Sequence, residues 1–148
     1  MMFGYGIIVL PTLISMIIQF FFVKKDTYPK NTFLQPPSYV FGIVWSLIYL
    51  LFGVYIYLVS KNEEPFVYWI YVLAMINFIA NLSWTPIVFN KKQYVIGVYI
   101  ICVMISTLIG LIVATSDVLS KTLLIPYLSW LILAFILNIE LARNEKNK

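Results

Sequence analysis

Aromatic and amide side chains recur at helical spacing in three apolar stretches of the chain, and these are the side chains best suited to chemistry. Rings on one helix face can stack on a flat apolar molecule, and an amide can both donate and accept a hydrogen bond. An apolar cavity with a few convergent polar groups is the usual form of a ligand site. The three faces comprise Phe41, Trp45, Tyr49 and Phe52; Asn77, Asn81 and Trp84, with Thr85 beside them; and Tyr127, Trp130, Ala134 and Asn138.

The depth of each residue in the membrane helps to separate a ligand contact from a membrane-interface anchor, although core packing remains an alternative for every ring. At about 1.5 Å per residue, Trp45 lies roughly 12 Å inside its apolar stretch, and Trp130 lies near the middle of another. Trp69 has the depth of an interface anchor, and Trp84 fits either role. Asn81 is deep, and an unpaired amide is costly in hydrocarbon, so we expect it to hydrogen-bond to another helix or to a ligand.

Several kinds of chemistry are disfavoured because their residues are missing. The chain has no histidine and one cysteine, Cys102, so it lacks the most common general base and metal ligand and cannot form an internal disulfide. Glu140, at the end of the last apolar stretch, is the only charged residue within the apolar stretches of the sequence. Ionisable residues within a membrane usually mark ion and proton pathways, so an ion-coupled transporter is disfavoured. We expect no metal and no cofactor, and the scattered basic residues give no sign of nucleic-acid binding.

The composition is that of an integral membrane protein. The 148 residues are 62% hydrophobic and 11% charged, with a mean hydropathy of +0.94, whereas soluble domains average about 45–50% apolar and about 25% charged. We expect one domain over residues 1–148. A spanning helix needs about 20 apolar residues, and the continuous runs predict an all-α bundle of five transmembrane helices. These lie near residues 3–23, 37–59, 66–89, 94–114 and 122–141.

The basic residues of the loops predict the orientation in the membrane. Lys61 and Lys121 lie on the same side as the N-terminus, whereas the other eight basic residues lie on the opposite side. Because cytoplasmic loops carry the excess of Lys and Arg, we expect the N-terminus outside and the C-terminus in the cytoplasm. The longest connection, residues 24–36, is then cytoplasmic.

Prolines and small residues predict where helices bend and where they meet. Pro11 and Pro86 should bend the first and third helices, because proline removes a backbone hydrogen bond. Small residues repeated every four positions allow two backbones to approach closely. The fourth helix carries such a stripe at Ser106, Gly110 and Ala114. The partner of this stripe could be another helix of the chain or a second protomer, so a homodimer stays open.

Three blocks of the sequence, taken in order, resemble a known family. They run from Pro36 to Gly53, from Asn77 to Phe89, and from Leu123 to Asn138. The blocks are similar to the second, third and fifth helices of the TspO/MBR family, which comprises tryptophan-rich sensory proteins and mitochondrial translocator proteins. They occur in the family's order, and the resemblance covers the whole chain.

This resemblance implies a five-helix bundle, often dimeric, with a cavity open towards the connection of residues 24–36. Relatives bind porphyrins, and some bind cholesterol or synthetic drugs. By motif position, the ligand-contacting residues correspond to Trp45, Asn81, Trp84, Thr85, Trp130 and Ala134. The expected partners are therefore a tetrapyrrole or another planar hydrophobic ligand, and the lipid bilayer.

Departures from the family pattern weaken some of its implied properties. The C-terminal sterol motif needs a tyrosine, and none lies between Leu137 and Arg143, so sterol binding is less supported than tetrapyrrole binding. The residues Phe33-Leu34-Gln35 stand where the family has a tryptophan before its double proline, and Tyr99-Ile100 stands where it has an aspartate.

Three functions remain open from the sequence. The leading hypothesis is a membrane receptor or sensor for a planar hydrophobic ligand such as protoporphyrin IX. The second is an enzyme that degrades porphyrin in light, for which Trp45 and Trp130 are the candidate catalytic residues because they are redox-capable. The third is a transporter of porphyrin-like or sterol-like ligands.

Overall fold

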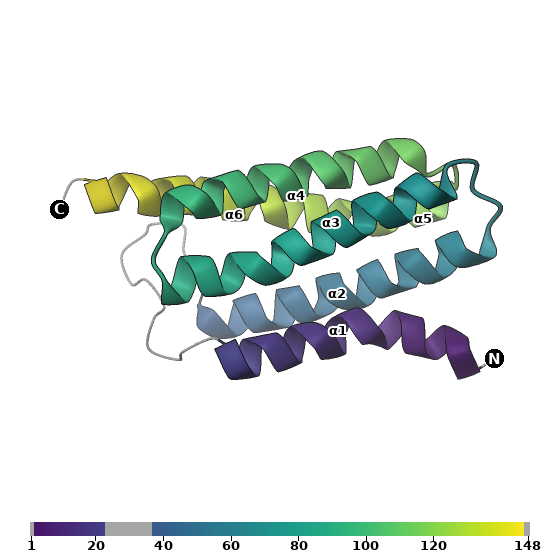
Figure 1. Cartoon of the computed structure of the whole chain (residues 1–148), viewed down its shortest axis with the longest axis horizontal. Coiled ribbons are helices and arrows are strands. Elements are labelled where there is room, and N and C mark those ends of the chain that lie inside the picture. Colours follow the sequence, from purple (N-terminus) through teal and green to yellow (C-terminus); the bar gives the residue numbers. More distant parts are fainter. Residues whose placement is uncertain (1, 23–36, 147–148) are drawn as a thin grey trace.

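The computed structural model describes residues 2–22 and 37–146, which form a bundle of helices without a β-strand (Figure 1). The elements in order are α1 (Met2–Phe22), α2 (Ser38–Lys61), α3 (Val67–Thr85), the π-helical turn η1 (Pro86–Asn90), α4 (Tyr94–Ala114), α5 (Val118–Leu123) and α6 (Ile125–Lys146). The predicted all-α bundle is therefore confirmed. The connection expected at residues 24–36, with its departure from the family at Phe33-Leu34-Gln35, lies outside the described residues.

The apolar stretches of the sequence form helices of membrane-spanning length. Four segments are long and apolar enough to cross a membrane: Tyr39–Lys61, Val67–Asn90, Tyr94–Ala114 and Val118–Lys146. The described part of α1 adds a shorter apolar helix, Gly6–Ile18. The last segment extends beyond the expected 122–141 at both ends. It begins early because Asp117 caps α5 by accepting a hydrogen bond from the Ser120 N–H at 2.8 Å, as a helix N-cap does.

The helices pack side by side in a simple order along the bundle (Figure 1). α1 lies along α2, α3 lies along α4, and α4 lies along α6. The helices α1 and α2 touch at Gly53, where a Cβ atom would lie 2.0 Å from the carbonyl oxygen of Ile8. A Cβ on Gly110 of α4 would lie 3.1 Å from Leu73 Cδ1 of α3. Gly110 therefore serves a helix contact within the chain, which is one of the two partners left open for the small-residue stripe.

Prolines modify two helices, as expected from their missing N–H groups. α1 contains Pro11 in its interior and is bent (Figure 1). At Pro86 the α-helix gives way to the π-helical turn η1, in which the Lys91 N–H donates to the Pro86 carbonyl at 3.2 Å. This hydrogen bond spans five residues, as in π-helices, which are frequent at functional sites. The turn buries Val88 and Phe89 in the core.

Two carboxylates, those of Glu64 and Asp117, form hydrogen bonds where the α2–α3 loop meets the α4–α5 loop. Glu64 in that connection is buried and accepts hydrogen bonds from the backbone N–H groups of Ser116 at 2.8 Å and Asp117 at 3.3 Å. Asp117 itself accepts from the Ser120 hydroxyl at 2.6 Å and from the Ser120 N–H. These hydrogen bonds favour the charged form and lower the pKa of Asp117 below its usual value. The loops α2–α3 and α4–α5 are therefore locked together.

Candidate ligand site

A chain of buried polar side chains crosses the middle of the bundle and joins four helices. Asn81 of α3 accepts a hydrogen bond from the Tyr49 hydroxyl of α2 and donates to the Tyr127 hydroxyl of α6 at 2.6 Å. The Tyr127 hydroxyl donates to Asn77 Oδ1 at 2.8 Å, and Asn77 Nδ2 donates to Thr107 Oγ1 of α4 at 2.8 Å. The sequence predicts that Asn81 faces the interior and hydrogen-bonds to another helix or to a ligand; it is buried, and its bonds to Tyr49 and Tyr127 confirm the first of these alternatives.

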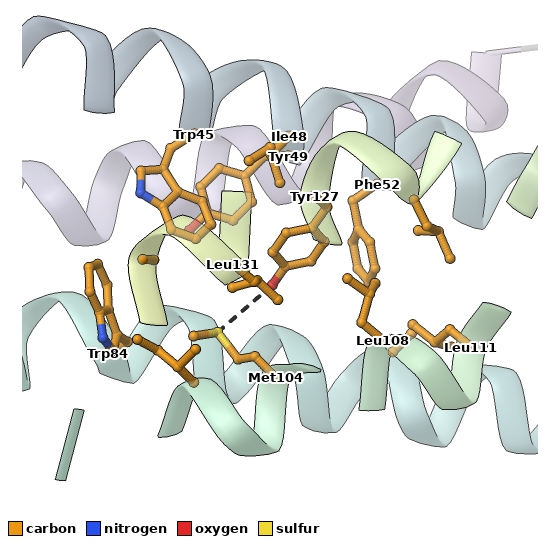
Figure 2. Close-up of a cluster of buried hydrophobic side chains, with 14 of the residues drawn as sticks. Trp45, Ile48, Tyr49, Phe52, Trp84, Met104, Leu108, Leu111, Tyr127 and Leu131 are labelled. Atoms are coloured by element: carbon orange, nitrogen blue, oxygen red, sulfur yellow. Dashed lines mark hydrogen bonds between the residues drawn. The ribbon is translucent and has the colours of Figure 1, made fainter. Parts of the chain in front are cut away.

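An aromatic cluster lies beside this polar chain, with Trp45 at its centre. The Trp45 ring centroid lies 5.7 Å from that of Tyr49 and 6.2 Å from that of Trp84. It also lies 6.1 Å from the Tyr127 ring and 6.4 Å from the Trp130 ring. Figure 2 shows Trp45 of α2 and Trp84 of α3 at the same end of the buried cluster, with Tyr127 beside Trp45 and its hydroxyl directed towards Met104. The structure thus brings two of the six predicted ligand residues, Trp84 and Trp130, against a third, Trp45.

Two tryptophans of this cluster carry buried N–H groups for which the described part of the chain offers no acceptor. Trp84 is only 2% exposed, and its Nε1 has no hydrogen-bond partner among the described residues. The same is true of Nε1 of Trp130, whose ring lies 5.2 Å from that of Phe41. Buried donors are almost always paired, and leaving one unpaired costs about 1–3 kcal/mol. Each such donor therefore needs an explanation, such as a ligand that supplies the acceptor.

The other two predicted ligand residues, Ala134 and Thr85, form none of the ring contacts described above. Ala134 of α6 is buried, and its small side chain occupies little of the space around the cluster. Thr85 is half-buried at the junction of α3 and η1, one residue after Trp84. Trp69 lies apart from the cluster and is 60% exposed at the start of α3, which agrees with its assignment as an interface anchor.

Sequence reasoning missed the partners that complete the cluster. It placed the two tyrosines, Tyr49 and Tyr127, on inward faces but did not pair their hydroxyls with Asn81. It also missed Phe89, whose ring lies 5.5 Å from Trp84 and 6.5 Å from Phe41. Pro86 was the available signal for Phe89, because the π-helical turn that follows the proline carries this ring into the core.

These features define a multi-pass helical membrane protein with a buried aromatic and amide cluster from α2, α3 and α6. The chain belongs to the TspO/MBR family, whose profile matches residues 7–143. It is 27% identical over 114 residues to the tryptophan-rich protein TspO of Archaeoglobus fulgidus, covering 74% of this chain and 72% of that relative. It is 28% identical over 136 residues to the tryptophan-rich sensory protein of Cereibacter sphaeroides, covering 85% of this chain and 82% of that relative.

Proposed function

We propose that this protein is a membrane receptor that binds a planar hydrophobic ligand, a tetrapyrrole such as protoporphyrin IX, in the aromatic cluster of α2, α3 and α6. Membership of the TspO/MBR family supports a sensory role, since one relative is named a tryptophan-rich sensory protein. The residues assigned to the ligand are Trp45, Asn81, Trp84, Thr85, Trp130 and Ala134.

The observation that carries this proposal is the pair of buried indole N–H groups of Trp84 and Trp130, neither of which has an acceptor among the described residues. Both rings flank Trp45, at centroid distances of 6.2 and 6.4 Å. A suitable ligand would combine a flat apolar body with acceptor atoms at its edge. A tetrapyrrole with carboxylate side chains has both, and charge-assisted hydrogen bonds to a carboxylate are the stronger kind.

Binding would replace contacts between rings with contacts to the ligand. Trp45 now packs against its aromatic neighbours and is 6% exposed, so a flat ligand must separate these rings to enter. Each aromatic pair is worth about 0.5–1.5 kcal/mol beyond simple burial, which the ligand must match. Asn81 uses one N–H and its oxygen for Tyr127 and Tyr49. Its amide still has a second N–H and a second lone pair for the ligand.

The test compares Trp45→Ala with Trp69→Ala in a dark titration of the purified chain with protoporphyrin, followed by porphyrin absorbance. Losing the central ring should weaken binding by about tenfold or more, since 1.4 kcal/mol corresponds to one decade. Trp69→Ala removes an equally large but exposed ring and should leave the affinity unchanged. Trp45→Phe keeps a ring in the core and separates binding from folding. If Trp45→Ala and Trp69→Ala bind equally well, this site assignment fails.

Light separates the receptor from an enzyme that degrades porphyrin. In that second function Trp45 and Trp130 would be the redox-active side chains, and their ring centroids lie 6.4 Å apart. A porphyrin product that forms in light, and that Trp45→Phe and Trp130→Phe abolish, would establish the enzyme. Porphyrin flux into sealed vesicles, absent from protein-free vesicles, would establish a transporter instead.

We also propose that the N-terminus lies outside and the C-terminus in the cytoplasm. Arg143 and Lys146 at the end of α6 and Lys91 and Lys92 before α4 lie at the same end of the bundle, as the excess of basic residues on the cytoplasmic side requires. A topology reporter fused after Lys148 should be active only in the cytoplasm. Activity on the outer side alone would overturn the orientation.

A further inference from the structure

A groove on the outside of the bundle combines an apolar floor with basic residues at one end. It lies between the start of α4 and the end of α6 and has a volume of about 230 Å³. The α4 side includes Val98 and Tyr99, and the α6 side includes Ile139 and Ala142, with Arg143 and Lys146 at the end. None of these residues belongs to the aromatic cluster, so the groove is a separate feature.

The charges of the groove are basic. Arg143 and Lys146 are three residues apart on α6, so they lie on the same helix face, and both are exposed. The two acidic residues at this end of α6, Glu140 and Glu145, do not line the groove. A ligand that fits must therefore present an anion to this end.

The residues that line the groove extend along α6 towards its last turn. Ile139 lies seven residues before Lys146, the last residue of α6, which is a distance of about 10 Å along the helix. Val98 lies in the second turn of α4, in an apolar spanning segment. The apolar part of the groove thus reaches into the hydrocarbon region, whereas the two cations lie at its edge.

We propose that this groove binds one anionic phospholipid, with its phosphate held by Arg143 and Lys146 and an acyl chain lying against Val98, Ile139 and Ala142. Basic pockets between transmembrane helices on the cytoplasmic side suit anionic head groups. Arginine can hold a phosphate through two parallel hydrogen bonds. The proposal is independent of ligand binding in the aromatic cluster.

The test uses native mass spectrometry of the purified full chain, titrated with phosphatidylglycerol or with phosphatidylcholine of the same acyl chains. Each basic residue near the head group contributes about 1 kcal/mol, so two of them predict about a 30-fold preference for phosphatidylglycerol. Arg143→Gln/Lys146→Gln should abolish this preference. Ala142→Phe keeps both cations but fills the apolar floor, and it should weaken the binding of both lipids.

The matched control is Lys91→Gln/Lys92→Gln, which removes the same charge from the same end of the bundle but from residues that do not line the groove. It should keep the preference for phosphatidylglycerol. An equal loss in both double variants would overturn the proposal, because surface charge alone would then explain the preference. Unchanged lipid binding in Ala142→Phe would also overturn the proposal. If Arg143→Gln/Lys146→Gln does not fold, Ala142→Phe is the variant that tests the groove.

Discussion

The Tyr127 hydroxyl is the point where the polar chain of the bundle is most sensitive to a single change. It accepts a hydrogen bond from Asn81 Nδ2 at 2.6 Å, donates to Asn77 Oδ1 at 2.8 Å and lies 3.9 Å from Met104 Sδ (Figure 2). Tyr127→Phe keeps the ring, which is buried, and removes only the oxygen. Two amides that are 1–2% exposed then lose a partner.

The size of the effect follows from the number of bonds. Hydrogen bonds between membrane helices average about 0.6 kcal/mol, with a maximum of about 1.7 kcal/mol. Loss of two bonds therefore predicts that Tyr127→Phe lowers the free energy of unfolding by about 1–3 kcal/mol. Equilibrium unfolding in mixed micelles with increasing dodecyl sulfate, followed by circular dichroism, measures this difference.

A second tyrosine provides the matched control. Within residues 2–22 and 37–146, the Tyr55 hydroxyl forms one hydrogen bond, to Thr115 Oγ1 at 2.8 Å, and Thr115 Oγ1 also donates to the Leu111 carbonyl. Tyr55→Phe should therefore cost only about 0.6 kcal/mol. If the two variants lose the same free energy, or if Tyr127→Phe loses none, the polar chain does not stabilise the bundle as argued.

Three further changes test other contacts. Glu64→Gln replaces one of the two oxygens that accept from the Ser116 and Asp117 N–H groups. It should lower the free energy of unfolding by about 1–3 kcal/mol. Glu63→Gln, at an exposed position, is the control and should leave the free energy of unfolding unchanged. Gly110→Leu should overpack the contact with Leu73 and lower the free energy of unfolding by about 1–3 kcal/mol. Gly42 has open space around it, so Gly42→Leu should not overpack the bundle. Equal thermal stability of the two variants would count against the contact between Gly110 and Leu73. Because hydrogen bonds from Ser120 lower the pKa of Asp117, its contribution to stability is complete above its unfolded pKa of about 3.9 and is lost as the pH falls through the folded pKa. Asp117→Asn should remove this acid-dependent loss from the thermal unfolding midpoint, and an unchanged pH profile would contradict the assignment.

The helices could be predicted from the sequence because hydrocarbon leaves the backbone few alternatives. A continuous apolar run must satisfy its own hydrogen bonds, and only a helix or a closed barrel does so. This constraint does not apply outside the hydrocarbon, so it does not predict the residues at which helices begin and end in the polar connections. Asp117 starts α5 before the expected residue 122, and this depends on a side-chain cap in a short polar stretch.

The site was only partly predictable for a related reason. Helical spacing placed Trp45, Asn81 and Trp130 on inward faces, because spacing reports which face of one helix is buried. It does not report how two helices are rotated and shifted relative to each other. The pairing of Asn81 with Tyr49 and Tyr127 depends on that relation among α2, α3 and α6. Phe89 depends in addition on the change of helix type after Pro86.

The polar chain and the aromatic cluster share two residues, Tyr49 and Tyr127, and this links the packing of the bundle to the proposed binding of a ligand. The rings of both lie within 6.1 Å of the Trp45 ring, and both hydroxyls bond to Asn81. A ligand that displaces Trp45 must therefore either leave these hydroxyls in place or replace their hydrogen bonds. The donors and acceptors that it meets are hydroxyls, amides and indole N–H groups, all of which are neutral. Selectivity in such a site depends on shape and on the positions of ligand acceptors, because a wrong ligand would leave buried polar groups unpaired.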